Sequence, residues 1–391
     1  MRITQLKISG YRSIRSIALR LKPVNVIVGA NGTGKSNLYR ALYLLSAAAN
    51  GQLAAVLAKE GGMTSALWAG KRSKLDDPRF MVAVRLDDLS YKIECGRVPH
   101  SDRIFMPDGA LAYKTESGMA WFSNDPDIKV EKLTVDYRGR DIPLLTRKRA
   151  HISARNMDGR PIEYPLAVTE CESVLSGLRE PHLFPDLSVL RQEILGWRFY
   201  HHFRTDLSSP LRREQIPTFT PILSHDGRDV ASALATILPI SGPRDLQEHL
   251  EKAFPGALLQ LDMTDAIVSL SLKMPGFDRP FSARELSDGT LQYLCLLAAL
   301  LTPRPPNLMV LNEPETSIHP DLFGPLAALI VAAGKRSQLI VTTHAHELAT
   351  HIKNAGDVQA FELEKVDGET RVVGAKLSDY EEDTDEDENE V

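Results

Sequence analysis

Residues Gly29 to Ser36 read Gly-Ala-Asn-Gly-Thr-Gly-Lys-Ser, which is the complete spacing of a phosphate-binding loop. The apolar run at residues 24–28 precedes this loop, and a helical pattern begins at Asn37. Strand, glycine-rich loop and helix is the context that the motif requires. Glycines let backbone N–H groups surround a phosphate, and the helix N-terminus adds a favourable dipole. The sequence therefore predicts that the chain binds a nucleoside triphosphate, with Lys35 near the β- and γ-phosphates and the Ser36 hydroxyl on Mg²⁺.

A second motif lies near residue 310, where the apolar run 308–311 ends in Asn312 and Glu313. A Walker B strand ends in this way, with a Mg²⁺ partner followed by a catalytic carboxylate. Glu313 is the candidate general base, which would orient and deprotonate the attacking water. The alternative is a strand that simply ends in a solvated glutamate. The phosphate loop upstream favours the catalytic interpretation.

The apolar run 339–341 leads through two threonines to His344. We expect parallel strands to bring His344 beside the γ-phosphate, where it would act as a phosphate sensor. A surface or capping role is the alternative, and a structural role is favoured for His346. Upstream, Leu286-Ser-Asp-Gly-Thr290 opens an apolar helix and offers a hydroxyl and backbone N–H groups to an anion. Alone this motif indicates a helix cap, but its place before residues 308–313 indicates a signature loop.

With these elements in order, the chain resembles the ABC-type ATPase heads of the RecF, SMC and OLD group, and most of all the bacterial RecF-like AAA ATPases. The resemblance is strong over residues 1–48 and 280–375 and moderate over 195–240. The segments that carry it are Ile8–Ile14, Gly29–Asn37, Leu223–Asp229, Leu286–Thr290, Asn312–Pro320 and Thr342–His344.

This resemblance implies an ATP-sandwich homodimer, in which the phosphate loop of one subunit and the signature loop of the other enclose ATP and Mg²⁺. Ser287 and Gly289 would then contact the γ-phosphate in trans, and residues 316–319 would face the dimer partner. Arg284 is a weaker candidate for positive charge in trans. The residues expected to hold the phosphates are Asn31, Gly32, Thr33, Gly34, Lys35, Ser36 and Asn37.

The chain departs from the family pattern at Asn312, where many such ATPases have aspartate. An amide keeps an oxygen for a Mg²⁺-bound water but loses the charge, which predicts slower turnover or weaker Mg²⁺ binding. Because Glu313 is retained, we still expect ATP hydrolysis. The glutamine of a Q-loop is not assigned. The Asn-Lys-x-Asp base reader of GTPases is absent from the sequence.

The predicted fold class is α/β: a P-loop NTPase with an ABC-type ATPase head, a mixed sheet, an antiparallel β subdomain and an inserted helical lobe. Alternating residues between Phe80 and Tyr137 predict an antiparallel meander, and residues 50–78 are expected to be irregular. The expected domains are a split head (1–48 and 256–375), a β subdomain with a basic segment (79–164), a helical lobe (165–255) and a disordered acidic tail (376–391).

Composition limits the classes of protein. Nine acidic residues and no basic ones lie between Asp379 and Glu390, so the rest of the chain carries +4 although the net charge is −5. Such a run repels itself and builds no core, which favours a disordered tail over a calcium loop. The cysteines are scattered and no apolar run has membrane-spanning length, so we expect a cytoplasmic protein without a membrane partner. In transporters the signature lies much closer to the phosphate loop than the 286 − 36 = 250 residues here. The segment between the motifs is too rich in proline and strand pattern for a long coiled coil, and the 391 − 344 = 47 residues after His344 are too few for a nuclease domain.

Two segments bear on nucleic acid. The basic segment from Arg138 to Arg160 could contact double-stranded DNA or be a solvated hairpin, and the sequence favours neither. Residues 197–204 interleave aromatic and basic side chains, and packing against the core is favoured there over base stacking. Two hypotheses follow: an ATPase coupled to DNA in repair or genome maintenance, and an ATP-gated scaffold for a protein effector in phage defence or toxin control.

Overall fold

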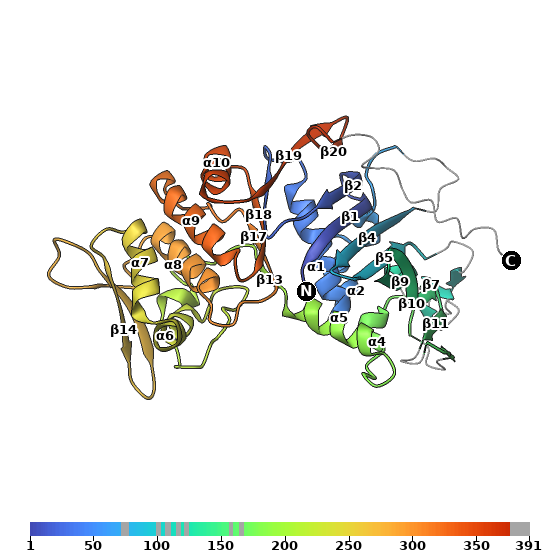
Figure 1. Cartoon of the computed structure of the whole chain (residues 1–391), viewed down its shortest axis with the longest axis horizontal. Coiled ribbons are helices and arrows are strands. Elements are labelled where there is room, and N and C mark those ends of the chain that lie inside the picture. Colours follow the sequence, from blue (N-terminus) through green and yellow to red (C-terminus); the bar gives the residue numbers. More distant parts are fainter. Residues whose placement is uncertain are drawn as a thin grey trace.

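The computed structural model describes residues 1–71, 78–98, 103–105, 111–114, 119–120, 125–155, 159–163 and 168–375. The predicted acidic tail, residues 376–391, lies outside this range. Figure 1 shows two lobes on either side of a central sheet, with helices α6 to α9 at one end and a large antiparallel sheet at the other. The central sheet carries the predicted nucleotide motifs.

The central sheet has the order β13-β17-β18-β3-β19-β20, and all its pairs are parallel except the last. Its strands are β13 (Arg198–Tyr200), β17 (Leu308–Asn312), β18 (Gln338–Thr343), β3 (Val24–Val28), β19 (Gln359–Val366) and β20 (Glu369–Val372). In register, Leu311 pairs with Val341, and Val341 pairs with Val26. The motifs at residues 29, 312 and 344 therefore all follow the carboxyl ends of neighbouring strands, where ligands bind in open parallel sheets.

Side chains of the central sheet alternate between two hydrophobic cores. Ile27, Val310 and Ile340 belong to one core, whereas Val26 and Val341 belong to the other. The strands are buried on both faces, which explains why their sequences read as continuous apolar runs rather than as alternating patterns.

The first core lies between the central sheet and an antiparallel sheet of order β12-β11-β10-β9-β5-β4-β1-β2. Its strands are β1 (Ile3–Tyr11), β2 (Ile14–Arg20), β4 (Arg79–Leu86), β5 (Leu89–Gly96), β9 (Asp127–Tyr137), β10 (Arg140–Lys148), β11 (His151–Arg155) and β12 (Pro161–Glu163). The predicted antiparallel arrangement is confirmed. The sheet also takes in the N-terminal strands, because Ile8 of β1 pairs with Val82 of β4. A separate sheet contains β6 (Arg103–Phe105), β7 (Leu111–Lys114) and β8 (Met119–Ala120).

Helices cover both faces of the central sheet. Buried residues of α1 (Lys35–Ala49), α2 (Leu53–Lys59), α3 (Gly62–Ala66), α4 (Val174–Gly177) and α5 (Pro185–Gly196) belong to the first core. Those of α6 (Val230–Ser241), α7 (Pro243–Ala253), α8 (Asp288–Leu300), α9 (Phe323–Ala333) and α10 (His346–Ala355) belong to the second. Residues 50–78 were predicted to be irregular, and this is wrong for the two short helices α2 and α3. In the described part of the chain, no helix has the length and apolarity to cross a membrane.

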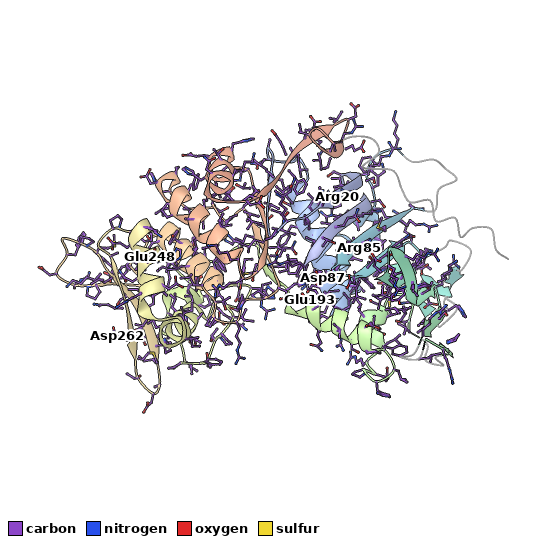
Figure 2. The ribbon with its side chains drawn as sticks, in the orientation of Figure 1. Arg20, Arg85, Asp87, Glu193, Glu248 and Asp262 are labelled. Atoms are coloured by element: carbon purple, nitrogen blue, oxygen red, sulfur yellow. The ribbon has the colours of Figure 1, made fainter. Side chains whose placement is uncertain are left out.

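A small sheet of β14 (Leu258–Met263), β15 (Val268–Lys273) and β16 (Phe281–Ser282) packs on the second core. Figure 2 shows Asp262 and Glu248 at this end of the molecule, and Arg85 and Asp87 on the antiparallel sheet. Glu193 of α5 lies between these regions, and its carboxylate links the N-terminus to the segment before β17 of the central sheet. Its Oε2 accepts from the Met1 ammonium at 3.3 Å and from the Asn307 amide at 2.6 Å, just before β17.

Candidate nucleotide-binding and hydrolysis site

The predicted phosphate loop connects β3 to α1. Gly34 caps α1 with φ 107° and Gly32 has φ 83°, conformations that side-chain-bearing residues rarely adopt. A Cβ on Gly34 would also lie 2.2 Å from the Thr370 hydroxyl of the β20 hairpin. Asn31, Gly32 and Ser36 are exposed at the loop surface, Asn37 is half-buried, and Thr33 is buried with its hydroxyl donating to the Ala30 carbonyl at 2.9 Å.

Lys35 is buried beneath this loop, with 4% of its side chain exposed. Its ammonium donates to the carbonyls of Gly29 at 2.7 Å and Ala30 at 3.0 Å. Burial lowers the pKa of Lys35, and the carboxylates of Glu313 and Glu315 oppose that shift. A buried positive charge under a glycine-rich loop at a helix N-terminus is the arrangement that binds phosphates.

Glu313 directly follows β17 and points toward the same region. Its Oε1 lies 3.9 Å from the Lys35 ammonium and 3.7 Å from Nδ1 of His344. The backbone of Glu313 has φ 50°, and its N–H donates to the Thr342 carbonyl at 2.8 Å. The structure thus brings together the three residues predicted to be catalytic, Lys35, Glu313 and His344.

Glu315 is a member of this cluster that the sequence analysis did not single out. Its side chain is 4% exposed, and Oε1 accepts from the Thr343 hydroxyl at 2.6 Å and the His344 N–H at 3.0 Å. The same oxygen lies 3.1 Å from His344 Nδ1. Within the described residues, the buried Oε2 atom has no hydrogen-bond partner. Glu315 therefore positions His344. The sequence feature that could have indicated Glu315 is the second carboxylate of Glu313-Pro-Glu315.

Asn312 is buried at the end of β17 and makes two side-chain hydrogen bonds. Its Oδ1 accepts from the Thr342 hydroxyl at 2.8 Å, and its Nδ2 lies 2.8 Å from Nδ1 of His201. His201 follows β13, and its ring packs on Tyr39 of α1 at 5.4 Å between centroids. Burial, with Arg40 nearby, lowers the pKa of His201. The predicted role of Asn312 at Mg²⁺ stays a prediction, and His201 is a neighbour of this site that the sequence analysis did not assign.

Ser287 and Gly289 begin α8. Ser287 caps the helix, and its Oγ accepts from the Thr290 N–H at 3.2 Å. Gly289 lies against the loop after β17, so that an added Cβ would be 2.4 Å from the Ser317 carbonyl. α8 packs in the core on the opposite face of the central sheet from α1. Among the described residues, no hydrogen bond or ion pair joins Ser287 or Gly289 to the phosphate loop of the same chain.

The residues present fit ATP and Mg²⁺. Lys35, the exposed Ser36 hydroxyl and the backbone of residues 31–37 supply donors and an oxygen ligand, and Glu313 stands opposite them. The described residues contain no cluster of three or more His, Cys, Asp or Glu side chains able to hold a metal by themselves. Proteins commonly bind Mg²⁺ through one or two side chains together with substrate phosphates.

The structure decides part of the nucleic-acid question. Arg147 of the basic segment is fully buried in an ion pair with Glu131 at 3.0 Å, so this side chain is neither solvated nor accessible to DNA, and both interpretations of the segment exclude it. The Arg147 guanidinium can be buried because it donates to the Glu131 carboxylate and to the backbone carbonyls of Glu172 and Thr169. The segment 197–204 belongs to the core edge, as favoured, since Trp197, Phe199 and Phe203 are at most 2% exposed. Six basic side chains of the segment are exposed: Arg138, Arg140, Lys148, Arg149, Arg155 and Arg160.

The fold and the residues at its strand ends define a P-loop ATPase domain of the ABC type. A family profile described as "AAA domain, putative AbiEii toxin, Type IV TA system" matches residues 125–348, and one described as "AAA ATPase domain" matches residues 1–105. The chain belongs to the first of these families, whose match spans more than half of its length. No curated protein sequence matches the chain.

Solved structures with a similar fold include heads of SMC proteins. An SMC head bound to the C-winged helix domain of ScpA aligns with a TM-score of 0.52 and 17% identity, over 97% of this chain and 99% of that chain. A Pyrococcus furiosus Smc head with an extended coiled coil, bound to the C-terminal domain of ScpA, gives 0.49 and 15% over 96% and 97%. A Thermotoga maritima SMC head gives 0.43 and 14% over 96% and 100%. The first likeness supports the α/β fold of an ABC-type head, as predicted.

Proposed function

We propose that this chain is a Mg²⁺-dependent ATPase whose two copies enclose ATP between the phosphate loop of one and the signature loop of the other. The observation that carries the proposal is the approach of Lys35 and Glu313 to 3.9 Å at the carboxyl edge of the central sheet. A buried cation and a carboxylate facing the same space suit phosphate binding and activation of water.

The residues divide the work as follows. Residues 31–37 bind the phosphates, Lys35 neutralises their charge, and Ser36 supplies a Mg²⁺ ligand, with Asn312 contributing through a bound water. Mg²⁺, when bound, offsets charge on the phosphate oxygens. Glu313 orients and deprotonates the attacking water, and Glu315 holds His344 where its ring can contact the γ-phosphate.

The separation of the two anion-binding loops within one chain supports the proposed dimer. Because α1 and α8 pack on opposite faces of the central sheet, Ser287 and Gly289 serve a phosphate loop on another copy. Light scattering after size-exclusion chromatography tests this with Glu313→Gln, which would bind ATP but hydrolyse it slowly. We expect ATP to double the mass of Glu313→Gln, whereas Lys35→Ala in the same background stays monomeric. A Glu313→Gln protein that binds ATP but remains a monomer contradicts the sandwich dimer.

We further propose that dimerisation is coupled to duplex DNA, in repair or genome maintenance. The exposed basic residues of β10, β11 and the turn between them, including Lys148, Arg149 and Arg155, support this because phosphate contacts need accessible positive charge. Charge reversal of these three should abolish DNA-stimulated ATP hydrolysis and leave basal hydrolysis intact. Arg147 is excluded from the set because it is structural. Equal DNA binding by the reversed variant would exclude this surface.

The alternative is an ATP-gated scaffold that holds or releases a separate protein effector in the cytoplasm. Its support is the family description, which names a toxin of a toxin–antitoxin system. Affinity purification from the native host, with and without residues 376–391, tests it. A stoichiometric partner that depends on ATP supports the scaffold, and DNA-stimulated hydrolysis without such a partner favours the first proposal.

A further inference from the structure

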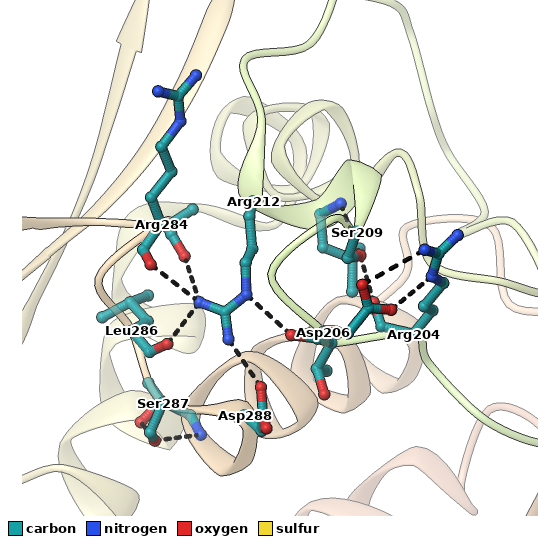
Figure 3. A network of polar contacts seen from close by, with 12 residues as sticks. Arg204, Asp206, Ser209, Arg212, Arg284, Leu286, Ser287 and Asp288 are labelled. Atoms are coloured by element: carbon teal, nitrogen blue, oxygen red, sulfur yellow. Dashed lines mark hydrogen bonds and ion pairs between the residues drawn. The ribbon is translucent and has the colours of Figure 1, made fainter.

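Arg212 lies at the end of a short 3-10 helix, η2 (Pro210–Arg212), in a breaker-rich stretch that no predicted motif covers. Its side chain is 6% exposed, and its guanidinium group is surrounded by backbone carbonyls and one carboxylate (Figure 3). The acceptors are the carbonyls of Thr205 at 2.8 Å, Ala283 at 3.2 Å, Arg284 at 3.1 Å and Leu286 at 2.7 Å, and the Asp288 carboxylate at 2.7 Å.

Four of these five acceptors belong to the six residues from Ala283 to Asp288, immediately before and at the start of α8. We propose that Arg212 is the positioning residue that fixes the shape of the signature loop, residues 286–290, together with residues 283–285 immediately before it. This inference rests on the proposed function, because it assigns the group that prepares the loop for the phosphate of the other subunit. The side chain of Arg284 points away from Arg212 (Figure 3). The guanidinium of Arg212 with its bonds to residues 283–288 is called the clamp.

The direction of the carbonyls matters for anion binding. In a trans peptide the C=O and N–H groups point in opposite directions, and the structure contains no cis peptide bond among its described residues. The Leu286 carbonyl points at Arg212, so the Ser287 N–H points away from it. Arg212 thereby turns the carbonyls of the loop inward, so that the Ser287 N–H faces the opposite side, where an anion can approach the start of α8.

Arg212 also controls the one acidic side chain in the motif. Asp288 is 57% exposed and adjoins Ser287, so a free carboxylate there would repel an incoming phosphate. The ion pair at 2.7 Å draws that carboxylate to Arg212 and offsets its charge. Ser287, Asp288 and Arg212 line an open pocket of about 750 Å³ together with the residues Asp206, Leu207 and Ser208.

Two other charged residues near Arg212, Arg204 and Asp206, pair with each other. Arg204 donates to both carboxylate oxygens of Asp206, and Asp206 also accepts from Ser208. This leaves Asp288 as the carboxylate that Arg212 contacts among the described residues. The segment that carries Arg212 thus lies beside the signature loop, on one side of the pocket. Through Arg212 it fixes the geometry of the signature loop.

The test compares Arg212→Ala and Arg212→Lys in the Glu313→Gln background. Arg336→Ala is the matched control, since Arg336 donates to the carbonyls of Leu300 and Thr302 at the other end of α8. Three quantities are measured: affinity for a fluorescent ATP analogue, ATP-driven dimerisation, and amide hydrogen exchange of residues 283–290 without nucleotide. The third measurement does not depend on the proposed ATPase function.

We expect Arg212→Ala to retain nucleotide affinity, to weaken dimerisation about tenfold or more, and to accelerate exchange at residues 283–290. That scale corresponds to losing one charge-assisted hydrogen bond. Arg212→Lys should give intermediate values because an ammonium lacks the planar fork of a guanidinium. Arg336→Ala should change neither ATP-driven dimerisation nor amide exchange at residues 283–290. If Arg212→Ala does not fold, Arg212→Lys decides by the same measurements.

The double variant Arg212→Ala/Asp288→Asn separates shape from charge. Continued weak dimerisation supports the role in fixing the loop, whereas full recovery would show that Arg212 acts only by neutralising Asp288 and would overturn it. Unchanged amide exchange in both Arg212 variants would also overturn the inference. A Glu313→Gln parent that fails to dimerise with ATP, together with faster exchange in Arg212→Ala, would count against the proposed dimer and not against the clamp.

Discussion

The Lys35 ammonium lies 3.9 Å from the Glu313 carboxylate, and β18 separates the two strands from which these residues extend. The backbone of Glu313 has φ 50°, a left-handed conformation that costs about 1 kcal/mol or more for a residue with a side chain. Its N–H bond to the Thr342 carbonyl helps to hold this conformation. Strain of this kind is typical of residues whose direction matters for function.

Glu315 should affect both stability and turnover. Glu315→Ala removes the acceptor of the Thr343 hydroxyl and the His344 N–H, leaving one buried and one partly buried donor without this partner. We expect the free energy of unfolding to fall by about 1–3 kcal/mol. Glu315→Gln keeps an acceptor oxygen, so it should retain more stability while lowering kcat through a misplaced His344. Urea denaturation and steady-state hydrolysis check this, and an unchanged kcat in a folded Glu315→Gln protein would contradict the positioning role.

Position 289 requires glycine because the loop after β17 leaves no room for a side chain. A Cβ there would lie 2.4 Å from the Ser317 carbonyl, so Gly289→Ala must shift the loop after β17. We expect weaker ATP-driven dimerisation with nucleotide affinity retained, measured by light scattering and titration of a fluorescent analogue. Gly196→Ala is the control, because a Cβ at that position meets no atom within 4 Å. Normal dimerisation of Gly289→Ala would show that the loop tolerates the shift.

Arg147 should contribute to stability rather than to DNA binding. It forms a fully buried pair with Glu131 and donates to the carbonyls of Thr169 and Glu172. Arg147→Met leaves Glu131 as an uncompensated buried charge, which costs about 3–5 kcal/mol in comparable cases. Lys148→Glu, at the exposed neighbouring position, should change the free energy of unfolding little. Denaturation midpoints compare the two, and equal stability of both variants is the result that this account rules out.

The lowered pKa of His249 should make the stability of the fold fall at acidic pH. Burial is the main cause that lowers the pKa of His249 below its ordinary value of 6.5, with Asp245 opposing and Lys252 adding to the shift. The unfolded chain therefore binds more protons than the folded chain just below that value. The contribution of His249 to stability is complete above the unfolded pKa and is lost as pH falls through the folded pKa. His249→Gln should flatten the fall of the urea midpoint below about pH 6.5, and an identical pH profile would contradict this.

Much of the site could be predicted because its chemistry is encoded locally. The phosphate loop, Glu313 and His344 each follow an apolar strand in the sequence, and parallel strands bring their carboxyl ends to one edge. The short helices at residues 53–66 were missed because they have seven and five residues, too few for a clear helical period.

Other features depend on contacts between distant segments. The burial of Arg147 requires Glu131 of a neighbouring strand, and the clamp at Arg212 requires carbonyls more than seventy residues downstream. A backbone carbonyl leaves no mark in a sequence, so a guanidinium that binds several of them resembles any other arginine. Glu315 could have been considered from the sequence, because a second carboxylate two residues after Glu313 was visible.

ATP hydrolysis by the purified chain, by Lys35→Ala and by Glu313→Gln, with nucleotide binding measured in parallel, tests the central claim most directly. The account predicts turnover only in the unmodified chain. Lys35→Ala should lose ATP binding, whereas Glu313→Gln should bind ATP and lose about 10²–10⁴-fold in kcat, the scale of a general base. Hydrolysis that survives Glu313→Gln unchanged, or an unmodified chain that neither binds nor hydrolyses ATP, would contradict it.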